Sequence, residues 1–257
     1  MPTAVPGRVG RRTLALVGGV GRAVLFLGAA LGGVVRRPWR GRQILLHLHF
    51  IGNKSVSILL LTSAFTGMVL TLEGYTALTR FGSEKFIGPV VALGLIRELG
   101  PVLAALMVTA RAGSAIAAVI ANMRVSEQID ALKSLAVEPI QYLVSPRLVA
   151  ALIAAPLLTA IFDLCGITAA YEFGIHILRL DGRSFLANVR ESIAWADVGV
   201  GMSKSIVFAV CMAWLASFHG FHARGGADGV GRATTRAVVG VAAIVLAGDY
   251  VMTSLFF

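Results

Sequence analysis

Long stretches without charged residues recur along this chain, and their lengths match the thickness of a lipid bilayer. Residues 55–72 and 205–223 are uncharged runs of 18 and 19 residues, close to the ~20 that a helix needs to cross the hydrocarbon core. Three further apolar stretches, 99–123, 148–171 and 237–257, are each interrupted by a single charged residue. The pattern predicts an all-α integral membrane protein. Its five transmembrane helices are expected at 53–76, 98–122, 147–174, 198–220 and 236–256. A shorter helix over 82–97, packed at the membrane edge, is expected to lead into the second of them.

Basic residues gather at one end of the chain and on one side of the predicted helices. Residues 1–72 contain nine Lys and Arg and no acidic residue, which accounts for most of the net charge of +10. With five spans, the side that holds the N-terminus carries fifteen Lys and Arg and the other side carries five. Because basic loops stay in the cytoplasm, we expect the N-terminus to be cytoplasmic and the C-terminus to lie on the opposite side.

A sixth apolar stretch, residues 13–35, would reverse this orientation if it crossed the membrane. Basic residues flank it on both sides. Three residues before it and one within it share one arc of about 100° on a helix: Arg8, Arg11, Arg12 and Arg22. This pattern is typical of a helix that lies in the headgroup region with its polar face towards anionic lipid. We therefore expect residues 1–44 to form a basic interfacial amphipathic helix and lead-in, followed by a membrane domain of residues 45–257. A sixth span remains the alternative.

The composition excludes several classes of function. At 57% hydrophobic and 14% charged residues, the chain has no polar domain over which a nucleic-acid surface would be spread. Cys165 and Cys211 both lie in apolar runs, so neither a disulfide framework nor a metal site is predicted. No phosphate-binding loop, hydrolase motif or metalloprotease motif is present. We expect no catalytic residue, metal site or cofactor in this chain.

Charged residues inside the predicted spans are candidates for function, because each is costly in hydrocarbon. They are Arg97, Glu98, Arg111, Asp163, Lys204 and Asp249. In the predicted orientation Arg97, Glu98, Lys204 and Asp249 lie towards the outer side. They would either rim a cavity for a zwitterionic or anionic head group or form ion pairs that hold the helices together. Arg111 follows Arg97 by fourteen residues, nearly the same face of a regular helix.

The connecting segment 123–147 predicts a short amphipathic helix at about 126–138. Ser126 is its expected N-cap, with acidic residues in the first turn, and Pro139 ends it. Ile129, Leu132 and Ala136 share one face. In a cytoplasmic loop, such a helix either docks a soluble partner or lies at the membrane surface.

Several runs of this sequence together resemble the MlaE/YrbE family. They are IRELGPVL (96–103), ARAGSA (110–115), SEQIDAL (126–132), LVSPR (143–147), KSIVF (204–208), GRATTR (231–236) and DYV (249–251). Members of this family are permease subunits of ABC transporters that work with MCE proteins. The resemblance covers about residues 45–257, whereas residues 1–44 match only in their basic, amphipathic character.

The resemblance implies a set of partners and a location. Two copies form a homodimer in the bacterial inner membrane, with the C-terminus in the periplasm and phospholipid in an outward-facing pocket between the copies. A cytoplasmic ABC ATPase subunit binds ATP and Mg, a small STAS-domain protein binds that ATPase, and a ring of MCE subunits carries phospholipid across the periplasm.

The resemblance also assigns roles to individual residues. Arg97 and Glu98 match the polar pair at the pocket, Lys204 and Asp249 match charges near it, and Leu78, Phe81 and Leu99 would be its apolar lining. The segment 126–138 matches a coupling helix. Its partner contacts would come from Glu127, Asp130, Leu132, Lys133 and Leu135. Ser134, Leu135 and Glu138 depart from the family pattern, in which a methionine and an aspartate are frequent.

The expected function is therefore a non-catalytic permease subunit that moves phospholipid between the inner membrane and an MCE ring. Such traffic between inner and outer membranes would maintain outer-membrane lipid asymmetry. Two alternatives stay open, an ATP-independent lipid channel or secondary transporter, and a scaffold that anchors the MCE ring. Secondary transporters often contain internal repeats, and the two halves of this sequence show no convincing repeat.

Overall fold

The computed structural model describes residues 4–35 and 41–256, so Arg36, Arg37 and Arg40 of the expected lead-in lie outside the described residues. All regular elements in the described part of the chain are helical, which confirms the predicted all-α class. The α-helices are α1 (Ala4–Val35), α2 (Gly41–Ile51), α3 (Val56–Leu78), α4 (Ile87–Gly94), α5 (Gly100–Val108), α6 (Ser114–Val125), α7 (Gln128–Ser134), α8 (Pro139–Leu143), α9 (Ser145–His176), α10 (Gly182–Ser192), α11 (Trp195–Phe221) and α12 (Gly226–Phe256). Short turns of other helix types join them: η1 (Asn53–Ser55), η2 (Thr79–Phe81), η3 (Glu84–Phe86), η4 (Leu95–Leu99) and η5 (Thr109–Gly113).

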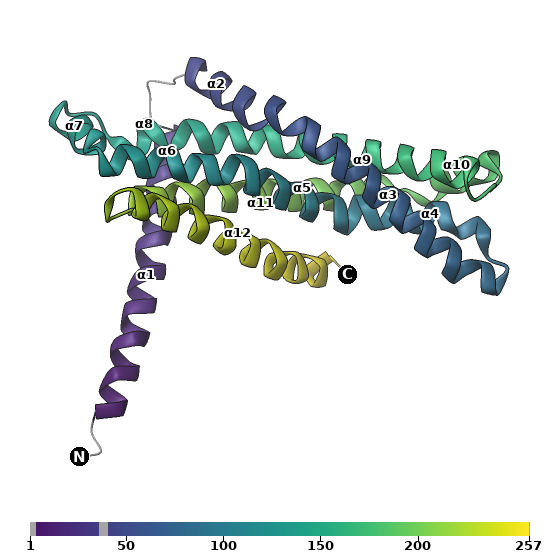
Figure 1. Ribbon diagram of the computed structural model, residues 1–257, viewed down its shortest axis with the longest axis horizontal. Helices are drawn as coiled ribbons and strands as arrows, with labels where there is room; N and C mark the ends of the chain where they lie inside the picture. Colours follow the sequence, from purple (N-terminus) through teal and green to yellow (C-terminus); the bar gives the residue numbers. More distant parts are fainter. Residues whose placement is uncertain (1–3, 36–40, 257) are drawn as a thin grey trace.

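The long helices form one bundle, and α1 crosses it at a steep angle (Figure 1). Within the described residues, six helical stretches are long and apolar enough to cross a membrane. Five of them contain the predicted spans: Gly41–Phe81, Glu84–Val125, Pro139–His176, Trp195–Phe221 and Gly226–Phe256. The sixth, Val17–Val35 of α1, meets the same criteria of length and composition. The structure therefore contains one more candidate span than the five expected.

The second half of α1 docks on one end of the bundle. Its buried stripe has a spacing of three and four residues, which is the period of one helix face: Ala23, Phe26, Ala30 and Gly33. The indole nitrogen of Trp214 donates to the carbonyl of Ala23 (2.7 Å), and the hydroxyl of Ser145 donates to that of Ala30 (2.8 Å). The rest of this half is largely exposed, so α1 is tied to the bundle along one narrow face.

Two glycines allow α3 and α9 to cross closely. A Cβ atom at Gly67 would overlap the carbonyl oxygen of Gly166 on α9. One turn earlier on α3, the hydroxyl of Ser63 donates to the carbonyl of Phe162. Small residues permit this approach in membrane bundles, where packing and interhelical hydrogen bonds replace the hydrophobic driving force.

The second span contains two π-helical turns, η4 and η5. In η4 the amide of Gly100 donates to the carbonyl of Leu95, five residues earlier, and Pro101, which follows at once, has no amide hydrogen to donate. The expected short helix that leads into the second span is present with different limits, as α4 (Ile87–Gly94), which continues through η4 into α5. Its side chains Ile87 and Val91 belong to the core. Both side chains are apolar, so burial in the bundle interior is favourable for this face of α4.

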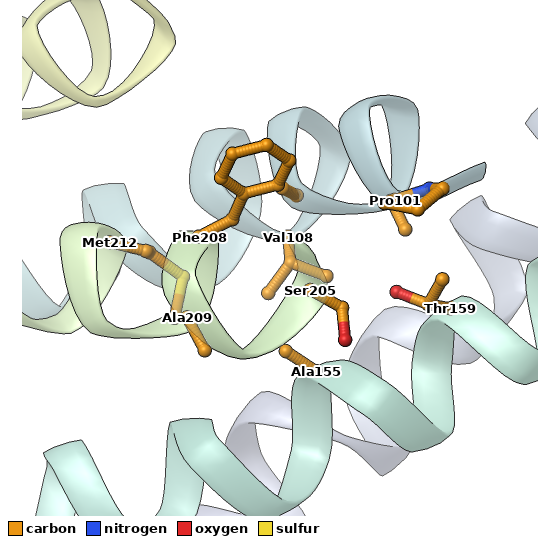
Figure 2. A pocket seen from close by; sticks show the side chains of 10 residues that line it. Pro101, Val108, Ala155, Thr159, Ser205, Phe208, Ala209 and Met212 are labelled. Atoms are coloured by element: carbon orange, nitrogen blue, oxygen red, sulfur yellow. The ribbon is translucent and has the colours of Figure 1, made fainter. Parts of the chain in front are cut away.

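The centre of the bundle is tightly packed. Figure 2 shows the meeting point of α5, α9 and α11, where Thr159 of α9 and Ser205 of α11 line a void together with Phe208 and Met212. The void is about 10 Å³, which is at most the space for one water molecule. It is therefore a packing defect and is too small for a lipid.

Candidate functional site

Lys204 of α11 is the centre of a charged cluster inside the bundle. Its side chain is fully buried, although Lys is rarely buried unless it is paired. The ammonium Nζ lies 2.6 Å from Oε2 of Glu98 and 2.8 Å from Oδ1 of Asp249, and it donates to Oγ1 of Thr253 at 2.8 Å. Thr253 also lies 3.1 Å from Oε2 of Glu98. The cluster therefore joins η4, α11 and α12 through one ammonium group.

Arg97 forms a second ion pair beside this cluster. Its Nε donates to Oδ1 of Asp197 at 2.7 Å, and its Nη2 contacts the same oxygen. The other carboxylate oxygen of Asp197 accepts the amide hydrogen of Ala194 at 2.9 Å, which caps the first turn of α11. Asp197 is buried, whereas about a third of the Arg97 side chain is exposed. Asp197 thus fixes the guanidinium at one edge, while part of the Arg97 side chain stays accessible.

Arg97 and Glu98 are adjacent in η4 but contact different partners. Arg97 pairs with the start of α11, and Glu98 pairs with a position two turns further along the same helix and with α12. Neighbouring side chains on a helix diverge by about 100°, so the two charges cannot neutralise each other and each requires its own partner. The structure brings together four of the predicted residues: Arg97, Glu98, Lys204 and Asp249.

Two members of the site, Asp197 and Thr253, were missed by the sequence analysis. Asp197 lies in the first turn of α11, where an acidic residue is common and does not by itself indicate a functional site. Thr253 follows Asp249 by four residues and therefore lies on the same helix face. That spacing is the only signal in the sequence that would have identified it.

The three residues expected to form the apolar lining of the pocket differ in burial. Leu99 and Leu78 are partly buried and pack against the core. Phe81 in η2 is 81% exposed, so within a single chain its side chain does not enclose a pocket. Their role as pocket lining stays a prediction.

The cluster contains charged groups of both signs. Glu98, Asp249 and Lys204 carry a net charge of −1, and the Arg97–Asp197 pair is neutral. Asp249 is 22% exposed, and the more exposed groups are Arg97 and Glu98, one of each sign. Such a pair matches a zwitterionic head group, while the buried contacts hold three helices together. Both roles expected from the sequence are thus compatible with one geometry.

Arg111 lies apart from this cluster. Its Nη1 donates to the carbonyl of Phe50, and its guanidinium carbon lies 4.5 Å from the centre of the Phe50 ring. Arg111 therefore stabilises the junction of α2 and η1, whereas Arg97 contacts α11. The regular helix assumed from the sequence does not apply here, because π turns change the rotation along this span.

The loop between α6 and α9 contains the expected short helix with different limits. α7 covers Gln128–Ser134, which is shorter than the predicted 126–138. Ser126 is not its N-cap, since its hydroxyl donates to the carbonyl of Asn122 at 2.8 Å, and Glu127 takes the cap position with a φ of 60°. Pro139 does not end α7 but begins α8, in keeping with the preference of proline for a first helical turn.

The side chains of α7 divide into an anchor and an exposed face. Ile129 is buried and Leu132 is partly buried, whereas Glu127, Asp130, Lys133 and Leu135 are exposed. Hydrogen bonds from Arg124, at 2.8 Å, and from Lys133, at 3.3 Å, hold the pKa of Asp130 below its usual value. Leu135 is 72% exposed, which leaves a large apolar side chain at the end of α7 available for contact.

The chain matches a known family over most of its length. The family model described as "Permease MlaE" matches residues 44–255. A Haemophilus influenzae protein described as "Intermembrane phospholipid transport system permease protein MlaE" is 36% identical over 250 residues, covering 97% of this chain and 96% of that protein.

Two other relatives extend the comparison. A "Probable ABC transporter permease protein" of Rickettsia felis is 42% identical over 253 residues, covering 98% of both chains. The chloroplastic protein TRIGALACTOSYLDIACYLGLYCEROL 1 of Arabidopsis thaliana is 36% identical over 230 residues, covering 88% of this chain and 66% of the plant protein.

Proposed function

This chain belongs to the MlaE permease family, and we propose from this that it is the membrane subunit of an ABC transporter that moves phospholipid between the inner membrane and an MCE ring. We infer the phospholipid substrate from the name of the Haemophilus relative. The chain is a multi-pass membrane protein. As a permease of this class it works with an ATPase subunit, where we place the binding of ATP and Mg and the chemistry of hydrolysis.

The observation that carries the proposal is the charged cluster at one level of the bundle. Arg97 and Glu98 are partly exposed, and their buried partners on α11, Asp197 and Lys204, hold them in place. In our proposal these two groups hold the lipid head group, and apolar faces that include Leu78, Phe81 and Leu99 contact its tails. Preformed positions reduce the entropy lost on binding, so the ion pairs that stabilise the bundle also prepare the site.

Further partners complete the proposed complex. Two copies of the chain would enclose the lipid between them, with a STAS-domain protein on the ATPase and MCE subunits on the periplasmic side. The exposed face of α7 would be the coupling contact with the ATPase. The ATPase subunits close when they bind ATP, and this movement is transmitted through α7. It collapses the lipid-binding cavity between the two copies and moves lipid to or from the MCE ring.

The proposed orientation places the N-terminus in the cytoplasm and the C-terminus in the periplasm. This orientation requires that α1 lie at the membrane surface without crossing the bilayer. The steep angle between α1 and the bundle supports this arrangement (Figure 1), because a helix across the bundle axis lies along the membrane plane when the bundle spans it. Anionic headgroups would then attract the basic lead-in.

Replacing both Arg97 and Glu98 by alanine is expected to lower the amount of phospholipid that co-purifies with the complex. The two partly exposed charges are lost together, so the head group loses both of its complementary partners. Lipid extraction followed by phosphate analysis measures the effect. Glu172→Ala, which removes an exposed acid elsewhere on α9, is the control. Lipid content and transport equal to those of the control would contradict the assignment.

A hydrolysis-deficient ATPase partner separates the proposal from its two alternatives. Lipid transfer by the complex reconstituted in liposomes should stop when the ATPase cannot hydrolyse ATP. Persistent transfer would indicate an ATP-independent channel or secondary transporter. A scaffold that only anchors the MCE ring would give no transfer with either form of the ATPase.

Leu135→Glu is expected to weaken binding of the ATPase subunit by ~30-fold, or about 2 kcal/mol, the range for an apolar contact at the centre of an interface. The side chain is exposed, so the variant should unfold at the same temperature as the parent protein. Affinity between the permease in nanodiscs and the soluble ATPase measures the effect. Leu186→Glu, an exposed position on α10, is the matched control, and equal affinities for the two variants would refute the docking role of α7.

A further inference from the structure

The charged side chains at η4 carry a net negative charge, although the chain as a whole is strongly basic. Five of them are joined by ion pairs: Arg97, Glu98, Asp197, Lys204 and Asp249. Three are acids and two are bases, so together they carry −1 when all are ionised. The net charge of +10 arises elsewhere, since residues 1–72 contain nine Lys and Arg and no acid. A ligand of this site therefore meets a local charge opposite in sign to the net charge of the protein.

Both cations of the site are already matched by acids of the same chain. Lys204 is fully buried, and its Nζ lies 2.6 Å from an oxygen of Glu98 and 2.8 Å from one of Asp249. Arg97 is about a third exposed, but Asp197 accepts a hydrogen bond from its Nε at 2.7 Å. A phosphate at Arg97 would thus meet a guanidinium whose charge is compensated. Neither cation offers a full positive charge to an anionic ligand.

The excess negative charge lies on the carboxylates around Lys204, and Glu98 is the more exposed of the two. Its side chain is 36% exposed, compared with 22% for Asp249. Oε2 of Glu98 accepts from Lys204 at 2.6 Å and lies 3.1 Å from the hydroxyl of Thr253. Among the described residues, Oε1 has only a 3.2 Å contact with that same hydroxyl. Because an ionised carboxylate has about four acceptor positions, Glu98 retains acceptor capacity that its own chain does not use.

These charges distinguish between phospholipid head groups. A zwitterionic head group adds no net charge, whereas an anionic one such as that of phosphatidylglycerol changes the total from −1 to −2. Like charges repel more strongly in the low dielectric of a protein site than in water. The site is therefore unfavourable for an anionic phospholipid, even though the protein itself is basic.

Hydrogen bonding separates the two common zwitterionic head groups. The primary ammonium of ethanolamine has N–H groups that donate to a carboxylate, and such charge-assisted hydrogen bonds are short and strong. The trimethylammonium of choline has no N–H group, and proteins recognise it through aromatic faces. The described contacts of Glu98 are with Lys204 and Thr253, which provide no aromatic face. An ethanolamine head group fits this environment better than a choline one.

We infer that the site prefers phospholipids whose zwitterionic head group ends in a primary ammonium, and that it discriminates against anionic phospholipids. The ammonium contacts Glu98, the phosphate contacts Arg97, and Asp249 contributes through its charge. Arg97 and Glu98 are adjacent and of opposite sign, which suits the two charges of one head group. This preference rests on the proposed function, because it concerns the lipid that Arg97 and Glu98 would hold.

The test measures which phospholipid stays bound to the full-length protein. Protein in detergent is incubated with equal amounts of phosphatidylethanolamine, phosphatidylcholine and phosphatidylglycerol that have identical acyl chains. It is then purified again, and its lipids are quantified by mass spectrometry. Lipid retained by Arg97→Ala/Glu98→Ala is subtracted as background. We expect phosphatidylethanolamine to exceed phosphatidylglycerol at least ~10-fold, with phosphatidylcholine between them.

Two variants separate the effect of charge from that of hydrogen bonding. Asp249→Asn removes one negative charge and leaves Glu98 in place, so it should retain more phosphatidylglycerol and still prefer ethanolamine to choline. Glu98→Gln makes the same change of charge and also removes the anionic acceptor, so it should lose both preferences. Glu172→Gln, which removes an exposed acid elsewhere on α9, is the matched control and should show the ratios of the parent protein.

The outcomes distinguish failure of the head-group preference from failure of the lipid site. If the parent protein retains no more lipid than Arg97→Ala/Glu98→Ala, both the proposed lipid site and its preference are wrong. Lipid retained in the proportions of the mixture, or enriched in phosphatidylglycerol, would keep the lipid site and overturn the preference. Unchanged ratios in Glu98→Gln would overturn the role of Glu98. Since the head groups are compared on the parent protein, the main result does not depend on the folding of any variant.

Discussion

Replacing Lys204 by methionine is expected to destabilise the protein by about 3 kcal/mol and to abolish lipid transfer. The variant leaves the carboxylates of Glu98 and Asp249 close together without their ammonium partner. Loss of one member of a buried ion pair costs ~3–5 kcal/mol, and the partial exposure of Glu98 places the cost at the lower end of that range. Thermal unfolding in detergent measures the stability, and lipid transfer by the reconstituted complex measures the function.

An uncharged version of the same cluster distinguishes recognition of the lipid from stabilisation of the helix bundle. The triple variant Lys204→Met, Glu98→Gln and Asp249→Asn removes all three charges and keeps similar volumes. Uncharged replacements of a complete buried ion cluster are often neutral or stabilising, so we expect this variant to regain most of the lost stability. Lipid transfer should remain absent. Recovery of transfer together with stability would show that the cluster only holds the helices together.

Gly67→Ala is expected to lower the stability by about 3 kcal/mol. The added methyl group would overlap the carbonyl oxygen of Gly166, and backbone cannot move aside as a side chain does, so the cost lies at the upper end of the ~1–3 kcal/mol for overpacking. The α3–α9 crossing would have to open, and unfolding temperature in detergent reports the change.

A second glycine of the same helix gives the matched control. At Gly74 an added Cβ atom would lie 3.6 Å from the Ile87 side chain, an ordinary contact distance. Gly74→Ala should therefore stabilise the protein by up to ~1 kcal/mol through helix propensity alone. If the two variants unfold at the same temperature, the close crossing of α3 and α9 does not limit stability.

The spans were predictable because a bilayer imposes a simple rule on the chain. A run such as 205–223 must be apolar over its whole length, so its place is visible without knowledge of its neighbours. The ends were less predictable, since α9 extends beyond the apolar stretch 148–171 on both sides and α12 begins well before the stretch 237–257. Charged residues such as Arg236 are tolerated there, where the helix leaves the hydrocarbon.

The partners within the site were harder to predict, because they depend on distances between helices. Lys204 and Glu98 are 106 residues apart in the chain, and Thr253 lies 49 residues beyond Lys204. Hydrophobic periodicity contains no information about such pairings. Oδ1 of Asp163 has no hydrogen-bond partner among the described residues. The sequence contains no sign of this, because it follows from the positions of all surrounding helices.

The π turn at Leu95–Leu99 makes the spacing of residues in the second span essential as well as their identity. A π turn bonds five residues apart instead of four, so it accommodates one residue that a regular helix would not. Deleting a single residue of 95–99 would let this segment form a regular helix with both flanks in their present orientation, so the residues of the turn itself would shift around the helix axis. Arg97 and Glu98 would then face new neighbours, although nearly every side chain of the site would still be present in the sequence. The protein is thus more sensitive here to the number of residues than to most conservative substitutions.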